Sequence, residues 1–300
     1  MPPPPVLSRV PAPPRWRPAR AGGTFRAPTP APVTRQRLKD LATLARRKGR
    51  RQHGLFLVEG VRSVEAAVQA GAPLVEVLVA DGLGNPRVEA LADRAGVPVH
   101  AVPERELAKV GDARSSQGVV AVARSVVTDA APAAGPVLLL DGVQDPGNVG
   151  ALIRTAAWFG VAAVVLDHAS ADPESPKAVR ASMGGIWDLA LARVPSLVPV
   201  LDALDQSGVA AWGADLGGTP AHRWSPGTNA ALVMGSEAHG LSEPVAAWLR
   251  QRPPVDRRFV CIGPGRGEAP PSRGVESLNV AVAGGVLLAR WLGPSGPVGA

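Results

Sequence analysis

Three polar side chains stand close to apolar runs that have the composition of buried strands. Asn148 and Arg154 belong to "DPGNVGALIRTA", soon after "PVLLL", and Glu237 belongs to "GSEAHGLS", which follows "AALVM". An amide orients polar groups, a guanidinium holds anionic oxygen atoms, and a carboxylate can fix either of them. Each residue also has a structural interpretation: Asn148 as a cap or turn residue, Arg154 as a solvated residue with a packed stem, and Glu237 as a surface carboxylate.

The first of these stretches has the spacing of a turn that leads into a helix. Pro146 fits a first helical turn, and Gly147 and Gly150 let the backbone approach another group closely. Arg154 follows Asn148 by six residues, which is about 240° around a helix. The two side chains therefore share one site only if Asn148 acts from the loop and not from a helical face.

Motifs of several common enzyme classes are missing from the sequence. No G-x-G-x-x-G follows "VLLLD", and "GPGRG" at Gly263 leads into prolines instead of a helix, which disfavours a dinucleotide. The chain has no Walker A stretch, no G-x-S-x-G around Ser236 and no H-E-x-x-H. The lone Cys261 forms no internal disulfide and the histidines lack metal-ligand spacing. We therefore expect a reducing environment and no metal.

The pattern after residue 136 predicts a scaffold that brings several loops together. Fully apolar strands alternate with helices, which is typical of a parallel sheet covered by helices on both faces. Functional sites of such sheets lie at the carboxyl ends of the strands, here the loops after Leu140, Met234 and Ile262. Ser242 is expected to cap the helix after the second of these loops, and a short helix is expected after "SPKAVRAS".

The last helix is expected to start at Glu276 or Ser277, within "VESLNVAVAGGVLLARWL". Its body consists almost entirely of valine, alanine, glycine and leucine, which predicts burial all round and very close packing through residues 283–285. Such a helix suits a subunit interface.

The rest of the chain divides into four parts. Residues 1–33 are rich in proline and arginine, lack acidic residues, and predict a disordered arm. In residues 34–124 predicted strands alternate with predicted helices, which indicates a small α/β domain. Residues 125–135 have the composition of a linker, which leads to a second domain at 136–293 and a tail at 294–300. The arm has three interpretations: compositional bias, an RNA-attracting tail, or a transit peptide, which its prolines oppose.

The positive charge of the chain predicts a polyanionic partner. The formal net charge is +7 and the pI is about 10.8, which favours nucleic acid over an anionic membrane. The stretch "ARRKGRR" is either a solvated helix end or a phosphate-contacting cluster, and its density beside the basic arm favours the second. No run spans a bilayer and no secretory signal is present, so we expect a soluble cytoplasmic protein.

Three stretches, taken in order, resemble motifs 1, 2 and 3 of the SpoU (TrmH-type) RNA ribose 2′-O-methyltransferases. They are "DPGNVGALIRTA", "LVMGSEAHGLS" and "ESLNVAVA". "SPKAVRASMGG" is also similar to the family, and "ARRKGRRQHGLFLVEG" with "QGVVAVA" resembles its substrate-binding domain of ribosomal-protein type, so the likeness spans about 35–291. The resemblance implies a SPOUT fold with a trefoil knot. It also implies S-adenosylmethionine at backbone contacts of Gly235, Ile262 and Leu278, and an obligate homodimer built with the final helix.

The resemblance further implies transfer of a methyl group to a ribose 2′-hydroxyl. Because a guanidinium is a poor base, Arg154 is expected to anchor phosphate and stabilise the reacting oxygen instead of removing its proton. Asn148, Ser277 and Asn279 would orient polar groups, and Glu237 would fix Arg154 or the knot loop. The loop before motif 3, Gly263 to Arg273, is longer than the family's compact form.

The RNA is expected to be ribosomal, of the 23S type, because the separate N-terminal domain and "RRKGRR" resemble members that modify ribosomal RNA. One alternative is a tRNA ribose methyltransferase. The other is a catalytically inactive, RNA-binding ribosome assembly factor, and the intact set of five polar site residues counts against it.

Overall fold

The computed structural model describes residues 33–111, 117–130, 134–252, 258–263 and 277–293. Their contacts group them into two compact units. One holds Val127–Ala171 with the described residues from Leu189 onward, and the other holds the described residues up to Val126 with Asp172–Asp188. The expected arm at 1–33, apart from Val33, the loop from residue 264 to 273 and the tail from residue 294 lie outside the described residues.

The C-terminal unit contains a seven-stranded sheet in which every pair of neighbours is parallel, as the apolar strands predict. Four of its strands are buried along most of their length, because helices cover both faces. In sheet order the strands are β11 (Phe259–Cys261), β9 (Ala210–Pro220), β10 (Ala230–Met234), β6 (Val137–Leu140), β7 (Ala163–Asp167), β8 (Ala190–Val194) and β5 (Val127–Thr128). The last of these forms within the stretch that was expected to be a linker.

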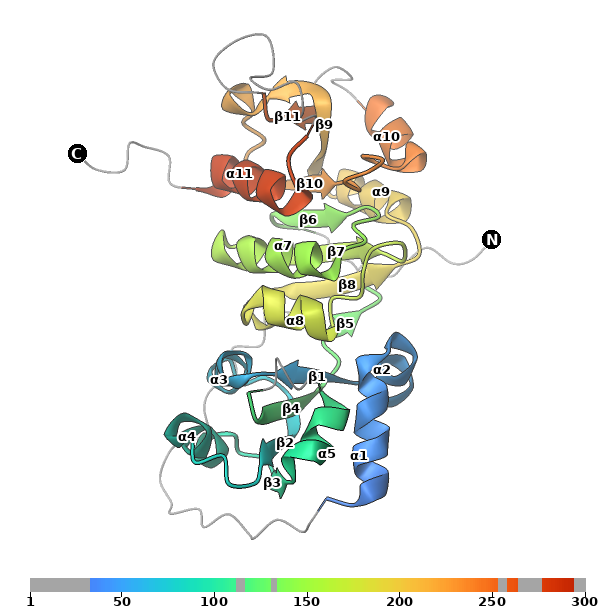
Figure 1. The fold of residues 1–300 in the computed structure, drawn as a ribbon. Helices are drawn as coiled ribbons and strands as arrows, with labels where there is room; N and C mark the ends of the chain where they lie inside the picture. Colours follow the sequence, from blue (N-terminus) through green and yellow to red (C-terminus); the bar gives the residue numbers. More distant parts are fainter. Residues whose placement is uncertain (1–32, 112–116, 131–133, 253–257, 264–276, 294–300) are drawn as a thin grey trace, which may run out of the picture. The chain divides into compact units, whose positions relative to one another are not determined.

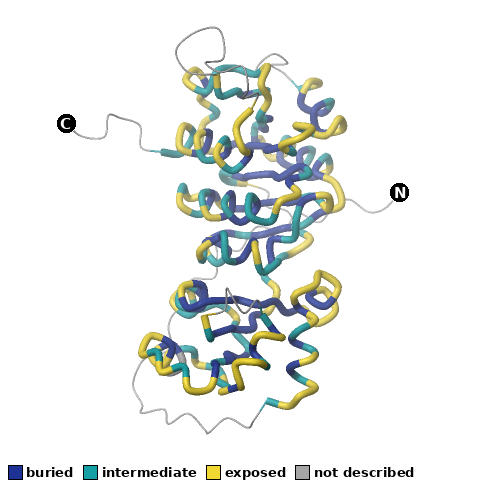
Figure 2. The backbone as a smooth tube through the Cα atoms, in the orientation of Figure 1, coloured by how far each residue is buried: buried dark blue, intermediate teal, exposed yellow. Residues whose placement is uncertain are grey.

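Helices pack on both faces of this sheet (Figure 1). On one face α9 (Val198–Gln206) and α10 (Glu243–Arg250) bury their apolar sides against alternate residues of β6 and β10, including Leu139. On the other face lie α7 (Pro146–Trp158) and α11 (Val280–Leu292), which pack against each other. Figure 2 shows the central strands buried and the outer sides of the helices exposed.

Helix α11 departs from its expected form in two ways. It starts at Val280, three or four residues later than predicted, because Asn279 and not Ser277 caps it. It is also not buried all round, since Val282 and Val286 remain exposed. The predicted close packing is present at Gly284, where an added Cβ would lie 2.3 Å from a methyl carbon of Leu152.

The N-terminal unit has a four-stranded mixed sheet in the order β1-β4-β2-β3, and its strands alternate with helices, as expected of a small α/β domain. The helices α1, α5 and the 3-10 turn η1 cover one face with leucines and valines. The elements are α1 (Arg35–Ala42), η1 (Thr43–Ala45), α2 (Arg47–His53), β1 (Leu55–Glu59), α3 (Val61–Gln69), β2 (Leu74–Ala80), α4 (Pro86–Arg94), β3 (Val99–Val102), α5 (Glu104–Val110) and β4 (Val119–Arg124).

A segment from the middle of the sequence completes this unit. Residues Asp172–Asp188 carry α8 (Pro176–Ser182) and the turn η2 (Gly185–Trp187), so the short helix lies within "SPKAVRAS" and not after it. Arg180 forms an ion pair with the buried Glu59, and Trp187 stacks on Phe56 with ring centroids 5.6 Å apart. The domain limits expected from the sequence, 34–124 and 136–293, stay predictions.

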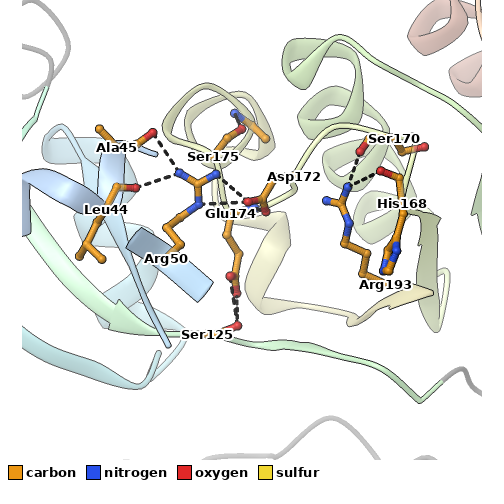
Figure 3. A network of polar contacts seen from close by, with 11 residues as sticks. Leu44, Ala45, Arg50, Ser125, His168, Ser170, Asp172, Glu174, Ser175 and Arg193 are labelled. Atoms are coloured by element: carbon orange, nitrogen blue, oxygen red, sulfur yellow. Dashed lines mark hydrogen bonds and ion pairs between the residues drawn. The ribbon is translucent and has the colours of Figure 1, made fainter. Parts of the chain in front are cut away.

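Glu174 ties the same segment to the end of β4. Its carboxylate accepts hydrogen bonds from the Ser125 hydroxyl and from the backbone N–H of Val126, both at 2.8 Å (Figure 3). A buried carboxylate is stable only when such donors surround it. Segment 172–188 is therefore a structural part of the N-terminal unit, although the sequence places it between β7 and β8.

Among the described residues, no helix is both long and apolar enough to cross a membrane. In the same residues no group of three or more His, Cys, Asp or Glu side chains is arranged to hold a metal ion.

Candidate active site

The carboxyl ends of β6 and β10 lie side by side near the centre of the parallel sheet. The backbone N–H of Asp141 donates to the carbonyl of Met234 at 2.9 Å, so the ladder continues to the last residue of β10. The two loops that carry the polar residues predicted from the sequence therefore leave the sheet next to each other.

Asp145 sets the start of α7 and thereby the place of Asn148. Its carboxylate accepts from the backbone N–H groups of Gly147 at 2.7 Å and Asn148 at 3.0 Å, and Pro146 occupies the first turn. Asn148 consequently lies in the first turn of the helix and not in the preceding loop. Because six helical residues turn through about 600°, Asn148 and Arg154 point in directions about 120° apart.

Asn148, Glu237 and Asn279 form one hydrogen-bonded cluster. The side-chain amide of Asn148 donates to Oε1 of Glu237 at 3.1 Å, and the amide of Asn279 donates to the same oxygen at 2.5 Å. The Asn279 amide also lies 3.1 Å from Oδ1 of Asn148. One residue from each of the three motif-like stretches thus meets at a single carboxylate oxygen, which we call the Glu237 cluster.

The loop that carries Glu237 is closed by its own backbone. Ser236 and Gly240 exchange two backbone hydrogen bonds of 2.8 and 2.9 Å, and Gly240 adopts a positive φ of 66°. At Gly235 an added Cβ would lie 2.3 Å from the carbonyl carbon of Gly240, so only glycine fits there. These features hold Glu237 at the tip of a tight turn.

A buried carboxylate anchors the far end of that loop. Oδ2 of Asp141 accepts the backbone N–H of Ser242 at 2.6 Å, and Asp141 is only 4% exposed. Burial raises the pKa of Asp141, the nearby Asp167 carboxylate raises it further, and the hydrogen bonds from Ser242 oppose both effects. Ser242 also stands at the start of α10, as predicted, although its own side chain makes no capping bond.

Asn279 links the Glu237 cluster to α11. Its Oδ1 atom accepts the N–H groups of Ala281 at 3.0 Å and Val282 at 3.2 Å, which caps the helix. Oε1 of Glu237 accepts the N–H of Val280 at 3.0 Å. Three of the otherwise unpaired N–H groups at the helix start are therefore satisfied by site residues.

The structure does not join Arg154 or Ser277 to this cluster. Arg154 lies on the exposed side of α7, and no hydrogen bond or ion pair of its guanidinium occurs among the described residues. Ser277 is exposed in the segment that precedes α11. Arg154 is thus a solvated cation that makes no hydrogen bond or ion pair with the Glu237 cluster among the described residues.

Of the three residues expected to contact a cofactor, two directly follow strands of the parallel sheet. Gly235 follows β10, Ile262 follows β11, and these two strands flank β9 in the sheet. Leu278 precedes α11, and its side chain is 44% exposed. None of the three carries a charge, so they offer backbone groups and apolar surface, which suits a ligand held by main-chain hydrogen bonds and packing.

Two carboxylates that organise the site, Asp141 and Asp145, were not singled out from the sequence. Asp145 had a readable signal, because an aspartate directly before proline is typical of a helix start. Asp141 had none, since its partner Ser242 is 101 residues away along the chain.

Comparisons with known proteins identify the relatives of this chain. The SpoU rRNA Methylase family matches residues 135–255, and the MRM3-like substrate binding domain matches residues 35–121. The 23S rRNA (guanosine(2553)-2′-O)-methyltransferase RlmP of Bacillus subtilis is 33% identical over 257 residues, which cover 84% of this chain and 94% of the relative.

Two solved structures are similar over most of their length. The SpoU methyltransferase AviRb of Streptomyces viridochromogenes, in complex with AdoMet, has a TM-score of 0.70 and 26% identity and covers 86% of this chain and 97% of its own. The AdoMet-bound rRNA methyltransferase of Sinorhizobium meliloti has a TM-score of 0.68 and 26% identity, and the match covers 86% of this chain and 94% of that protein. Because both family models match and the Bacillus subtilis relative is 33% identical over 84% of this chain, the chain belongs to the SpoU (TrmH-type) family of 2′-O-methyltransferases.

Proposed function

We propose that the protein transfers a methyl group from S-adenosylmethionine to a ribose 2′-hydroxyl of ribosomal RNA. The observation that carries the proposal is the Glu237 cluster, in which Asn148, Glu237 and Asn279 meet at the carboxyl ends of the central strands. When bound, S-adenosylmethionine supplies a sulfonium methyl group; the 2′-oxygen forms a bond to that carbon, the carbon–sulfur bond breaks, and the hydroxyl proton leaves to solvent.

Arg154 is assigned the charge-handling role in this reaction. Its guanidinium has no competing carboxylate partner among the described residues, so it is available to a phosphate or to the reacting oxygen. A cation at that position stabilises the negative charge that grows on the oxygen as the proton leaves. The cluster amides of Asn148 and Asn279 act as neutral groups that orient ribose, and Gly235, Ile262 and Leu278 hold the methyl donor.

A homodimer completes the proposal. Val282 and Val286 lie one turn apart on α11 and form an exposed apolar stripe, and Leu278 is exposed in the segment just before the helix. Trp158, at the end of α7, is 84% exposed. An exposed apolar stripe of this kind marks an interface, and a second copy of the same two helices is its natural occupant. Because Arg154 points away from Asn148 of its own chain, the dimer is expected to bring it to the partner's site.

The RNA target is assigned to 23S-type ribosomal RNA in the cytoplasm. The support is the name of the Bacillus subtilis relative, a 23S rRNA methyltransferase, together with the separate substrate-binding domain. A tRNA target and an inactive assembly factor are the competing functions. The intact Glu237 cluster favours an enzyme over an assembly factor, because a protein that only binds RNA needs no such cluster.

The test is methyl transfer by the purified protein from S-[methyl-³H]adenosylmethionine to in vitro transcribed 23S rRNA and, separately, to bulk tRNA. We expect ribose methylation of the rRNA, and Arg154→Ala should lower its rate at least a hundredfold while cofactor affinity by calorimetry stays within about twofold. Arg250→Ala, an exposed arginine of α10, is the matched control. An active Arg154→Ala enzyme would overturn the role of this residue, and methylation of tRNA alone would overturn the target.

A further inference from the structure

The basic cluster of α2 is divided by the structure into one buried arginine and three exposed cations. Arg50 turns inward, where its guanidinium donates to the carbonyls of Leu44 and Ala45 and pairs with Asp172 at 2.6 Å (Figure 3). Its side chain is only 4% exposed. It is therefore a structural residue of the N-terminal unit and is not available to bind a phosphate.

The exposed cations lie on the opposite side of the same helix. Successive residues of a helix are rotated by about 100° around its axis. The side chains of Arg47, Lys48 and Arg51 therefore fall within an arc of about 100°, and Gly49 and Arg50 lie on the other side of the helix. Gly49 fixes this orientation, because an added Cβ would lie 2.2 Å from the carbonyl oxygen of Thr43. The helix is thus anchored through one face and presents three positive side chains on the other.

These three side chains line a single hollow. Among the described residues its lining consists of Arg47, Lys48 and Arg51, and its volume is about 370 Å³. None of them forms an ion pair among the described residues, and no acidic residue occurs in the sequence from Leu41 to Val58. Like charges three and four residues apart on a helix repel each other. An anion in the hollow would remove that repulsion.

We propose that Arg47, Lys48 and Arg51 form a binding site for backbone phosphates of the RNA substrate. The inference rests on the proposed function for the identity of the polyanion. Contacts of this type carry no base specificity, and they set where and in which orientation the RNA lies on the protein. The site therefore contributes affinity and placement, and the Glu237 cluster and Arg154 contribute the chemistry.

The experiment compares two triple variants of the full-length protein that lower the net charge equally. R47Q/K48Q/R51Q removes the proposed site. R87Q/K109Q/R250Q removes three surface cations that already pair with the carboxylates of Glu65, Glu106 and Glu243. Binding of a fluorescein-labelled 30-nucleotide RNA hairpin and of a 23S rRNA fragment is measured by anisotropy from 0.05 to 0.3 M KCl without methyl donor.

We expect the first variant to bind both RNAs at least tenfold more weakly at 0.15 M KCl. The slope of log Kd against log salt should fall by about 2 to 3, as three lost phosphate contacts require. The methylation KM should rise with kcat within about twofold, and the melting temperature should not fall. The second variant should change Kd less than threefold.

Equal Kd values and salt slopes for the wild type and R47Q/K48Q/R51Q would overturn the proposal, as would equal losses in the two variants. Sedimentation with phosphatidylserine vesicles is the second arm: loss of vesicle binding with unchanged RNA binding would assign the cations to a membrane. Because RNA binding is read without methyl transfer, failure of the enzymatic proposal and failure of the phosphate site give different results.

Discussion

Glu237 and Asn279 are in direct contact within the Glu237 cluster, with Oε1 of Glu237 2.5 Å from the amide nitrogen of Asn279. The same oxygen accepts from Asn148 and from the backbone N–H of Val280. Three donors, which lie at the starts of α7 and α11, therefore depend on one acceptor atom. A single truncation should loosen the whole cluster, because each donor would lose its partner at once.

Glu237→Ala is expected to lower the rate of rRNA methylation by about 10- to 100-fold, because hydrogen bonds to a charged acceptor contribute about 1.5–3 kcal/mol. Glu237→Gln keeps a carbonyl oxygen at the same place and should retain most of the activity if geometry dominates. Initial rates of tritium incorporation measure both. Equal, severe losses in the two variants would show that the charge and not the acceptor position matters.

Val282→Asp combined with Val286→Asp should convert the dimer to monomers, because two carboxylates would be buried without partners in the proposed apolar interface. Sedimentation velocity at micromolar protein measures the change. Leu216→Asp is the matched control, since Leu216 is 73% exposed but lies on β9 and outside the stripe. If the stripe variant keeps the wild-type sedimentation coefficient, the interface lies elsewhere or does not form.

Arg50→Gln should destabilise the protein by about 3 kcal/mol, because it leaves the largely buried Asp172 and two carbonyls without their cation. Arg51→Gln, one position along the same helix, should leave stability unchanged. Urea unfolding followed by circular dichroism compares the two. Similar urea midpoints for the two variants would mean that the inward and outward positions on α2 contribute equally to the free energy of unfolding.

Asp141→Asn should change how stability depends on pH. Burial raises the pKa of Asp141, so its contribution to stability is complete below the ordinary carboxyl pKa of about 4 and is lost as the pH rises through the higher folded value. Asparagine does not titrate and still offers an oxygen to the N–H of Ser242. The melting temperature of the variant relative to wild type should therefore increase from pH 4 to pH 7. A constant difference would mean that Asp141 does not titrate in this range.

Periodicity and strand-end rules predicted much of the site. The loops after Leu140 and Met234 were expected at one edge of a parallel sheet, and the structure places Asn148 and Glu237 there in contact. The prediction that these loops meet succeeds because the carboxyl ends of parallel strands lie at the same edge of the sheet, in whatever order the strands are arranged. The position of Asn279 was predicted from motif resemblance alone, and spacing gave no sign that it caps α11.

Features that depend on long-range burial could not be read from local patterns. The sequence shows Arg50 as one of several equal cations, and only tertiary contact with Asp172, which is 122 residues away, turns it inward. Helix α11 starts later than expected for a similar reason, because Glu237 and Asn279 together satisfy the first N–H groups of the helix. Both differences arise from partners that are distant in sequence.

Segment 172–188 has a consequence for how this protein can be divided. Since this segment packs with residues up to Val126, the described backbone passes between the two units three times, at 126–127, 171–172 and 188–189. A fragment that ends at residue 126 would leave Glu59, Arg50 and Ser125 without Arg180, Asp172 and Glu174. A graft that exchanges the RNA-binding module between enzymes must therefore transplant two separate pieces of gene, and a single cut between the halves would damage both products.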